Sequence, residues 1–391
     1  MTTTINNEQK KLNVPNLRFP EFQGEWEKSK LSDLCTFFSG GTPSSSNKDF
    51  YGGDIAFIRS GELHADSTEL FITQDGYDNS SAKMVEIGDL LLAMYGATSG
   101  DIAISKIKGA INQAILCIRT NQNKKFIESV WNKHVPKILR KYLQGGQGNL
   151  SADIVKGISF SFPTLEEQER IANLISLLDE RIATQNKIIE DLKRLKYAII
   201  EKEYRNKTKS FSRLGDFIEQ ISKRNKDRAI HNVLSVSNSQ GFIQQSEQFE
   251  NRIVASDDTS NYKIVERNHF AFNPARINVG SIARLITFEK GIVSPMYICF
   301  RTKDSLFPEY LGYYFESKQF FIEIQKRLEG SVRQCLSFEG LCNIPLSIPM
   351  VEVQQQIGKR LSALVQKIKL ETDFLELLQK QKKFLLHQMF I

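Results

Sequence analysis

The sequence predicts a mixed α/β (α+β) protein: two globular domains separated by a pair of long antiparallel coiled-coil helices, with pseudo-two-fold symmetry. Three observations predict this class: a motif that occurs twice, a long apolar heptad pattern after each copy, and strand-like segments before each copy. Internal repetition indicates the architecture before any local pattern does, and this repeat unit is far too long for a solenoid. Each unit is therefore a whole domain followed by a helix.

The repeated motif keeps a constant spacing in its two copies. The first copy reads Leu150-Ser151-x-Asp153, Ile158, Phe162-Pro163, Glu166, Gln168 and Ile171. The second copy reads Leu336-Ser337-x-Glu339, Ile344, Ile348-Pro349, Glu352, Gln354 and Ile357. The spacing predicts four segments in order: a first domain at 1–163, a central helix at 164–208, a second domain at 209–349 and a C-terminal helix at 350–391.

The two domains repeat more loosely than the motif does. Strand-like Gly109–Ile111 and Cys117–Thr120 are echoed by Gly291–Val293 and Cys299–Thr302. A helical stretch at 126–143 has its counterpart at 310–328. Between these anchors the halves diverge, notably Thr42–Leu63 against Asn225–Gln245. Because recognition usually depends on loops held by a rigid frame, this pattern indicates two domains doing one kind of task on different targets.

Each predicted long helix carries an apolar seam with steps of four and three, which is typical of a coiled coil. The seam positions are Ile171, Ile175, Leu178, Ile182, Gln185, Ile189 and Leu192 in the first helix, and Ile357, Leu361, Leu364, Ile368, Glu371, Leu375 and Leu378 in the second. Each helix of about forty residues spans about 60 Å. Two amphipathic helices that each pack only on their own domain are the alternative. Thr164 and Glu167 predict a capping box at the first helix start.

Gln185 and Glu371 interrupt the two seams at equivalent positions. In an antiparallel pair centred on the matching heptads they face each other, and such a polar layer fixes helix register. The alternative is that both side chains point to solvent. Leu174, Leu177, Ile188 and Leu195 flank the first seam, so the pair has more apolar surface than two helices bury on each other.

Composition is that of an ordinary globular chain, with 391 residues, 41% hydrophobic and 25% charged. The net charge of +7 favours a polyanionic partner. No apolar run reaches membrane-spanning length, and the polar start is unlike a signal peptide. The five cysteines lack C-x-x-C spacing, which indicates core thiols in a reducing cytoplasm.

Catalytic motifs are missing from the sequence. There is no phosphate-binding G-x-x-x-x-G-K-[ST] loop, and the five histidines lack H-E-x-x-H spacing. Asn273-Pro274-Ala275-Arg276 begins like the N-P-P-[YF] motif of amino-methyltransferases but lacks its second proline and aromatic residue. The sequence thus predicts a protein that recognises a target, without a catalytic or metal site.

Several segments resemble the specificity subunits of type I restriction–modification systems over essentially the full chain. They are Pro15–Phe22 with Gly24-Glu25-Trp26, Ser39–Ser44, Tyr51–Ile55, Arg59-Ser60-Gly61, Leu91–Gly100, Asn112-Gln113-Ala114, both P-x-x-E-x-Q-x-x-I helices and Lys383–Phe390. The second domain departs from the pattern, with Asn273–Gly280 in place of the Tyr95-Gly96 loop.

The resemblance implies a non-catalytic subunit that reads a bipartite, asymmetric site in double-stranded DNA, one half-site per domain. It further implies two methyltransferase subunits and two restriction/translocase subunits as partners. S-adenosylmethionine, ATP and Mg²⁺ are then expected in those partners and no cofactor in this chain. The expected location is the cytoplasm, without a membrane. Readers on one face of B-DNA need half-sites roughly 34 Å apart, a distance that paired helices can enforce.

Candidate DNA contacts are polar or basic residues of the divergent loops, since such side chains bind phosphates and base edges. In the first domain they are Thr42, Ser44, Asn47, Lys48, Arg59, Tyr95, Thr98, Ser99, Gln144, Gln147 and Asn149. In the second domain they are Arg224, Asn225, Lys226, Asn238, Asn273, Arg276, Asn278, Arg333 and Gln334.

Two other functions remain open at this point. One is a coiled-coil adaptor without a DNA role, and the other is a bifunctional enzyme with an unrecognised nuclease or methylase site. A gel shift with random duplex DNA across salt concentrations separates the adaptor from the DNA reader. DNA modification by the purified chain alone would support the enzyme.

Overall fold

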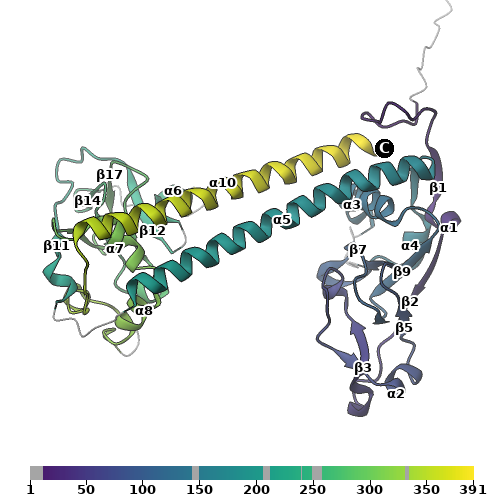
Figure 1. The fold of residues 1–391 in the computed structure, drawn as a ribbon, viewed down its shortest axis with the longest axis horizontal. Helices are drawn as coiled ribbons and strands as arrows, with labels where there is room; N and C mark the ends of the chain where they lie inside the picture. The colour runs from purple at the N-terminus through teal and green to yellow at the C-terminus, as the bar shows by residue number, and fades with distance from the viewer. Residues whose placement is uncertain (1–11, 143–148, 206–211, 239, 249–257, 331–333) are drawn as a thin grey trace, which may run out of the picture. The chain divides into compact units, whose positions relative to one another are not determined.

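The computed structural model describes residues 12–142, 149–205, 212–238, 240–248, 258–330 and 334–391. The chain divides into two compact units, one of Met1–Gln185 with Phe374–Ile391 and the other of Asn186–Asp373. The division falls inside both long helices, α5 (Leu165–Tyr204) and α10 (Val351–Met389). Each unit therefore combines one globular domain with parts of two helices (Figure 1).

The first unit contains two four-stranded sheets, ordered β2-β9-β6-β7 and β4-β3-β8-β5, and a small β1-β10 sheet. Its strands are β1 Glu27–Lys30, β2 Cys35–Ser39, β3 Tyr51–Ile58, β4 Phe71–Ile72, β5 Lys83–Val85, β6 Leu90–Ala93, β7 Ile102–Ile104, β8 Gly109–Ile111, β9 Ile115–Thr120 and β10 Ser159–Phe162. Its short helices are α1 Leu31–Leu34, η1 Lys48–Phe50, η2 Ser60–Glu62, α2 Gln74–Asp78, η3 Gly96–Thr98 and α4 Ala152–Gly157, and α3 spans Lys124–Tyr142.

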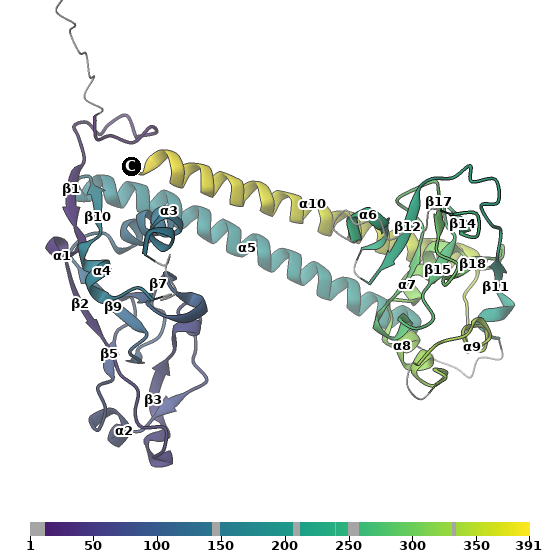
Figure 2. The ribbon, with the colours of Figure 1, turned by 180° about the vertical axis from the view of Figure 1, so that it is seen from behind.

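The second unit, at the right of Figure 2, repeats this strand order, as β11-β18-β15-β16 and β13-β12-β17-β14. Its strands are β11 Ile218–Ile221, β12 Val233–Ser237, β13 Gly241–Gln244, β14 Lys263–Glu266, β15 Phe270–Phe272, β16 Ile282–Arg284, β17 Lys290–Val293 and β18 Ile298–Thr302. Its short helices are η4 Leu214–Asp216, α6 Gln245–Gln248, η5 Ile277–Val279, α7 Pro308–Tyr314, α8 Lys318–Gln325 and α9 Phe338–Cys342.

The register of the sheets matches as well as their order. Cys117 pairs with Leu91, and Cys299 pairs with Ala271, in antiparallel ladders at the same place in each sheet. β3 pairs with β8, and β12 with β17, in parallel. Both cysteines are fully buried, and burial raises the pKa of each thiol to about 12. The predicted α/β repeat with equivalent core cysteines is confirmed.

One predicted helix is divided in the structure. The sequence predicts continuous helix over 310–328, but the chain forms α7 and α8, separated by Phe315–Ser317. Ser317 caps α8, because its hydroxyl accepts the Phe320 backbone N–H at 3.2 Å. Serine favours this cap position over a helix interior, so a new helix begins there. The counterpart α3 is continuous through Pro136.

The repeated glutamine of the motif explains how each long helix attaches to its own domain. Gln168 donates to the Pro163 carbonyl at 3.0 Å and accepts the Asn123 backbone N–H at 3.2 Å, next to the start of α3. Gln354 makes the equivalent bonds to Pro349 and Phe307, at 2.8 Å each, next to the start of α7. Both glutamines are at most 1% exposed.

The N-terminal segment lies beside the end of α10 in the first unit. The Leu17 backbone N–H donates to the Gln388 carbonyl at 3.0 Å. The capping-box prediction is half correct: the Thr164 hydroxyl accepts the Glu167 N–H at 3.4 Å. The Glu167 carboxylate instead accepts both Arg18 Nε and Nη2, at 2.8 and 2.7 Å, so it links the N-terminal segment to α5.

Within each unit the segments of α5 and α10 run antiparallel. In the first unit Lys382 forms an ion pair with Asp179, while Phe374 lies under Arg181, nearer the middle of both helices. In the second unit Arg360 pairs with Glu203, near the end of α5. The facing of Gln185 and Glu371 joins residues of different units and stays a prediction.

The seam positions are buried or partly buried, whereas most flanking apolar residues are exposed. Gln185 is itself buried, and Glu371 forms an ion pair with Lys367. Leu177, Ile188 and Leu195 are 65%, 40% and 50% exposed. Leu174 differs from them because it packs against the core of the first domain. The exposed apolar face of α5 is therefore narrower than the sequence predicts.

Candidate nucleic-acid interface

In the first domain, three separate loops meet at the residue that follows β6. The Met94 backbone N–H donates to the Ala114 carbonyl, and the Leu150 N–H donates to the Met94 carbonyl, at 2.8 and 2.9 Å. These bonds bring together the η3 loop, the β8–β9 turn and the segment that contains Asn149 and Leu150. The Thr42 hydroxyl donates to Gln113 of the same turn at 2.6 Å. The structure thus gathers candidate residues that lie about a hundred positions apart.

The Tyr95–Ser99 loop is held rigidly at its base. Gly96 and Gly100 have φ of +74° and +87°, a left-handed conformation that favours glycine. Trp131 of α3 donates to the Gly100 carbonyl at 2.8 Å, and the Ser99 hydroxyl donates to the Met94 carbonyl at 3.0 Å. Ser99 therefore shapes the loop, while the Tyr95 ring is exposed and free to stack on a sugar or base.

The segment before β3 is also ordered by its own polar side chains. Asn47 caps η1 by accepting the Asp49 backbone N–H at 3.1 Å. The Ser44 hydroxyl lies 2.8 Å from that of Ser46. Lys48, the next residue after Asn47, is exposed and has no acidic partner among the described residues. Such an unpaired cation at a loop tip is suited to a phosphate.

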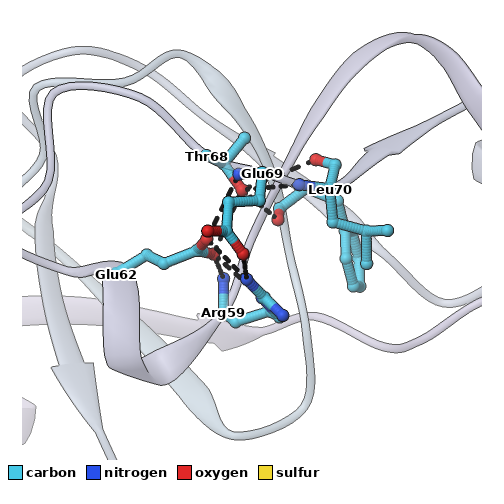
Figure 3. Close-up of polar contacts among 6 residues, drawn as sticks. Arg59, Glu62, Thr68, Glu69 and Leu70 are labelled. Atoms are coloured by element: carbon cyan, nitrogen blue, oxygen red, sulfur yellow. Dashed lines mark hydrogen bonds and ion pairs between the residues drawn. The ribbon is translucent and has the colours of Figure 1, made fainter. Parts of the chain in front are cut away.

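Arg59 lies in a polar cluster at the end of β3 (Figure 3). Its Nε and Nη2 donate to the Glu62 carboxylate at 3.1 and 2.8 Å, and Nη2 also donates to Glu69 at 3.1 Å. Glu62 accepts the backbone N–H groups of Arg59 and Glu69 as well, at 3.0 and 3.3 Å. The Arg59 side chain is the main cause that lowers the pKa of the Glu62 carboxyl to about 2. The pKa of the Arg59 guanidinium is raised in turn by its bonds to Glu62 and Glu69.

The Arg59 loop is joined to the Tyr95 loop through residues that no sequence motif singled out. His64 Nε2 lies 2.9 Å from Asp101 Oδ1, and Lys106 pairs with Asp66 at 2.7 Å. Only the local spacing of Arg59 and Glu62, three apart, could have indicated part of this cluster. The contacts of Glu69, Asp101 and Lys106 depend on how the loops fold together.

In the second domain, Asn225 does not meet the expectation of an accessible DNA contact. It is fully buried, and its amide donates to the Ile230 carbonyl at 2.9 Å and accepts the Ile230 N–H at 3.2 Å. Asparagine often closes loops in this way, so we assign it a structural role. Its neighbours Arg224 and Lys226 are exposed, and Arg224 donates to Asn261 at 2.8 Å.

Two other candidates of this domain, Asn238 and Asn278, line a groove of about 1100 Å³. Arg284 and Glu309 are also among its lining residues. Asn273 accepts the Ala275 N–H at 3.1 Å and so orders the loop on which exposed Arg276 lies. The Pro274 carbonyl of that loop accepts the Leu336 backbone N–H at 3.0 Å. Exposed Gln334 precedes Leu336 by two residues, so this bond brings it close to the Asn273–Arg276 loop.

Three candidates, Gln144, Gln147 and Arg333, lie outside the described residues. Among the described residues, no three histidine, cysteine or acidic side chains are grouped so that they could hold a metal ion. No helix of the described part is long and apolar enough to cross a membrane. The structure brings most candidates of the first domain to neighbouring loops and leaves their DNA contacts as predictions.

Comparison with known proteins shows a consistent similarity over the chain. The model of the type I restriction modification DNA specificity domain matches residues 23–194 and again 202–380. A putative type I restriction enzyme specificity subunit (MjaX) of Methanocaldococcus jannaschii is 24% identical, over 96% of this chain and 95% of its own length. The EcoR124I/EcoR124II specificity subunit of Escherichia coli is 27% identical over half of each chain.

A solved structure shares the fold of the whole chain. The S subunit of a type I restriction–modification system from M. genitalium aligns with a TM-score of 0.62 at 15% sequence identity. The alignment covers 97% of this chain and 99% of that one. Because the identity is low, this similarity concerns the fold alone.

Proposed function

The chain belongs to the family of type I restriction–modification DNA specificity domains, which it contains twice, and we propose that its two domains read the unlike halves of one bipartite DNA site. The observation that carries this proposal is a shared frame with unlike loops. Both domains have the same strand order and register. The Arg59 cluster lies in the first domain, whereas the second domain has Ser235 at the position of Arg59 and a groove lined by Asn238 and Asn278.

The charges of the candidate residues divide them into phosphate contacts and base or sugar contacts. Lys48, Lys226 and Arg276 are exposed and form no ion pair with the described residues. Free cations contribute affinity for phosphates without reading sequence. Tyr95, Asn238 and Asn278 offer a ring and amides, which suit bases or sugars. The candidate loops therefore hold both kinds of group that a sequence-specific DNA reader needs.

The chemistry of methylation and cleavage is assigned, in this proposal, to separate subunits. Two methyltransferase subunits and two restriction/translocase subunits are the expected partners, in the cytoplasm, and they are expected to bind S-adenosylmethionine, ATP and Mg²⁺. The exposed leucines Leu177, Leu195, Leu370 and Leu377 on the long helices supply apolar surface for such partners. Light scattering of the mixed complex tests the stoichiometry. One methyltransferase per chain would contradict it.

The decisive experiment on function maps methylated adenines genome-wide in cells with and without the gene. We expect the gene to add one split, asymmetric motif. A gel shift of the purified chain with random duplex DNA, repeated at several salt concentrations, tests the adaptor alternative. Binding that does not depend on salt, or no binding together with an unchanged methylation map, would contradict the proposed function.

A further inference from the structure

The Arg59 guanidinium is held on one side and open on the other. Its Nε and one Nη2 hydrogen are taken by Glu62, whose side chain is only 14% exposed. Nη2 also donates to Glu69, whose side chain is 89% exposed. Nη1 has no partner among the described residues. Nη1 is thus the open end of the guanidinium, while Nη2 is shared between Glu62 and Glu69 (Figure 3).

The charge of this cluster argues against a phosphate as its ligand. One arginine and two glutamates sum to a net negative charge, and two of these three side chains are well exposed. A phosphate is repelled by such a cluster, whereas a neutral base edge is not. By contrast, Lys48 carries a charge that no described carboxylate offsets. Arg59 therefore differs from the phosphate-binding candidates of the same domain.

The Nη1–Nη2 edge of Arg59 is the part of the side chain with which arginine binds guanine. Two parallel N–H groups on the Nη1–Nη2 edge match the O6 and N7 acceptors in the major groove. A guanidinium already fixed by a bidentate carboxylate loses little side-chain freedom on binding. Glu69 occupies one of the two donors that guanine needs, so it competes with the base. The Arg59 loop is also tied to the Tyr95 loop through His64 and Asp101.

The described part of the second domain has no equivalent of this cluster. Ile58 pairs with Ile111 as Leu234 pairs with Val293, so the residue equivalent to Arg59 is Ser235. Ser235 is buried. Two half-sites of different sequence require different base-contacting residues in the two domains, and the Arg59 cluster is such a difference.

We propose that Arg59 reads a guanine in the half-site of the first domain, that Glu62 is its positioning residue, and that Glu69 is a competitor which the base displaces. This inference rests on the proposed function, so the wild-type chain is tested first. The full-length chain is used to select sites from random duplexes. A split consensus supports the proposed function, and its absence contradicts that function before Arg59 is examined.

The variants are then compared on the selected duplex and on duplexes changed at one base pair. Arg59→Ala is expected to reduce discrimination at one guanine position by roughly 5- to 150-fold, with an unchanged dependence of affinity on salt. Glu62→Gln is expected to relax the same position, because the guanidinium is no longer held. Glu69→Gln is expected to tighten binding to the guanine site. Arg267→Lys, at an exposed ion pair with Glu289 in the second domain, is the matched control.

Two outcomes overturn the inference. If Arg59→Ala lowers the salt slope by about 0.9 and weakens all duplexes equally, Arg59 binds a phosphate. If Arg59→Ala and Glu62→Gln change the unfolding midpoint and leave the base preference unchanged, the cluster stabilises its loop and does not contact a base. Unfolding followed by tryptophan fluorescence identifies variants that do not fold, and Glu69→Gln, at an exposed position, keeps the inference testable in that case.

Discussion

Gln168 accepts the backbone N–H of Asn123 through its side-chain carbonyl at 3.2 Å, one residue before helix α3 begins. The same amide donates to the carbonyl of Pro163 and to the side chain of Gln122, at 3.0 and 2.7 Å. One buried side chain thus connects the start of α5 with the start of α3. The P-x-x-E-x-Q motif is repeated because each domain needs this junction.

Replacing Gln168 with alanine is expected to destabilise the first unit by about 1–3 kcal/mol, because buried polar groups lose their partners. The two tryptophans, Trp26 and Trp131, both lie in this unit. Urea unfolding followed by their fluorescence therefore reports it selectively. Glu169→Ala, at the next and exposed position, is the control. Equal midpoints for the two variants would show that the junction is not a stabilising contact.

The repeat made much of the fold predictable, since the echo of Gly109–Thr120 in Gly291–Thr302 aligns Cys117 with Cys299. The division of α7 from α8 was not predictable from the apolar pattern, because the cap at Ser317 depends on one hydroxyl. The candidate loops were identified by their divergence alone. Divergence between the two halves does not show which residues are buried, so the sequence does not distinguish buried Asn225 from its exposed neighbours. The contact of Thr42 with Gln113 could not be predicted either, because it forms only when the sheets bring the two loops together.

Acid should weaken the Arg59 cluster in a defined range of pH. The pKa of Glu62 is about 2 in the folded chain, compared with an ordinary value of 4.5. A carboxyl with a lowered pKa contributes stability that is complete above the ordinary value and is lost as the pH falls toward the folded value. Fluorescence-detected unfolding from pH 6 to about 3 should therefore show a steeper loss for the wild type than for Glu62→Gln. Parallel curves would contradict this.

Lys48→Ala is expected to weaken binding to all duplexes alike and to reduce the salt slope by about 0.9, the effect of one lost phosphate contact. The exposed position without an acidic partner among the described residues is the reason. Fluorescence anisotropy at four or more salt concentrations gives the slope. Lys156→Ala, on α4 and paired with Asp153, should leave the slope unchanged. A base-specific loss at Lys48 would contradict the phosphate assignment.

Asn225 and Lys226 are adjacent but should respond differently to alanine. Asn225→Ala removes both bonds to Ile230 from a buried site and should cost about 1–3 kcal/mol of stability. Lys226→Ala should leave unfolding unchanged and weaken DNA binding. Circular dichroism and anisotropy on the same preparations separate the two effects. Loss of base preference in Asn225→Ala without a change in stability would restore Asn225 as a DNA contact.

Phe390 near the end of the chain belongs to the core of the first domain. It is 2% exposed, and its ring centroid lies 5.2 Å from that of Phe126 on α3. The helix end is also fixed by Lys133, which donates to the Phe390 carbonyl.

Phe390→Ala leaves a cavity in this packing and should destabilise the first unit by about 3–5 kcal/mol. Phe384, on α10 and 59% exposed, is the matched control and should change stability little. Because Trp26 lies 5.8 Å from Phe126, fluorescence reports the change directly. A small effect of Phe390→Ala would mean that the domain closes its core without the end of α10.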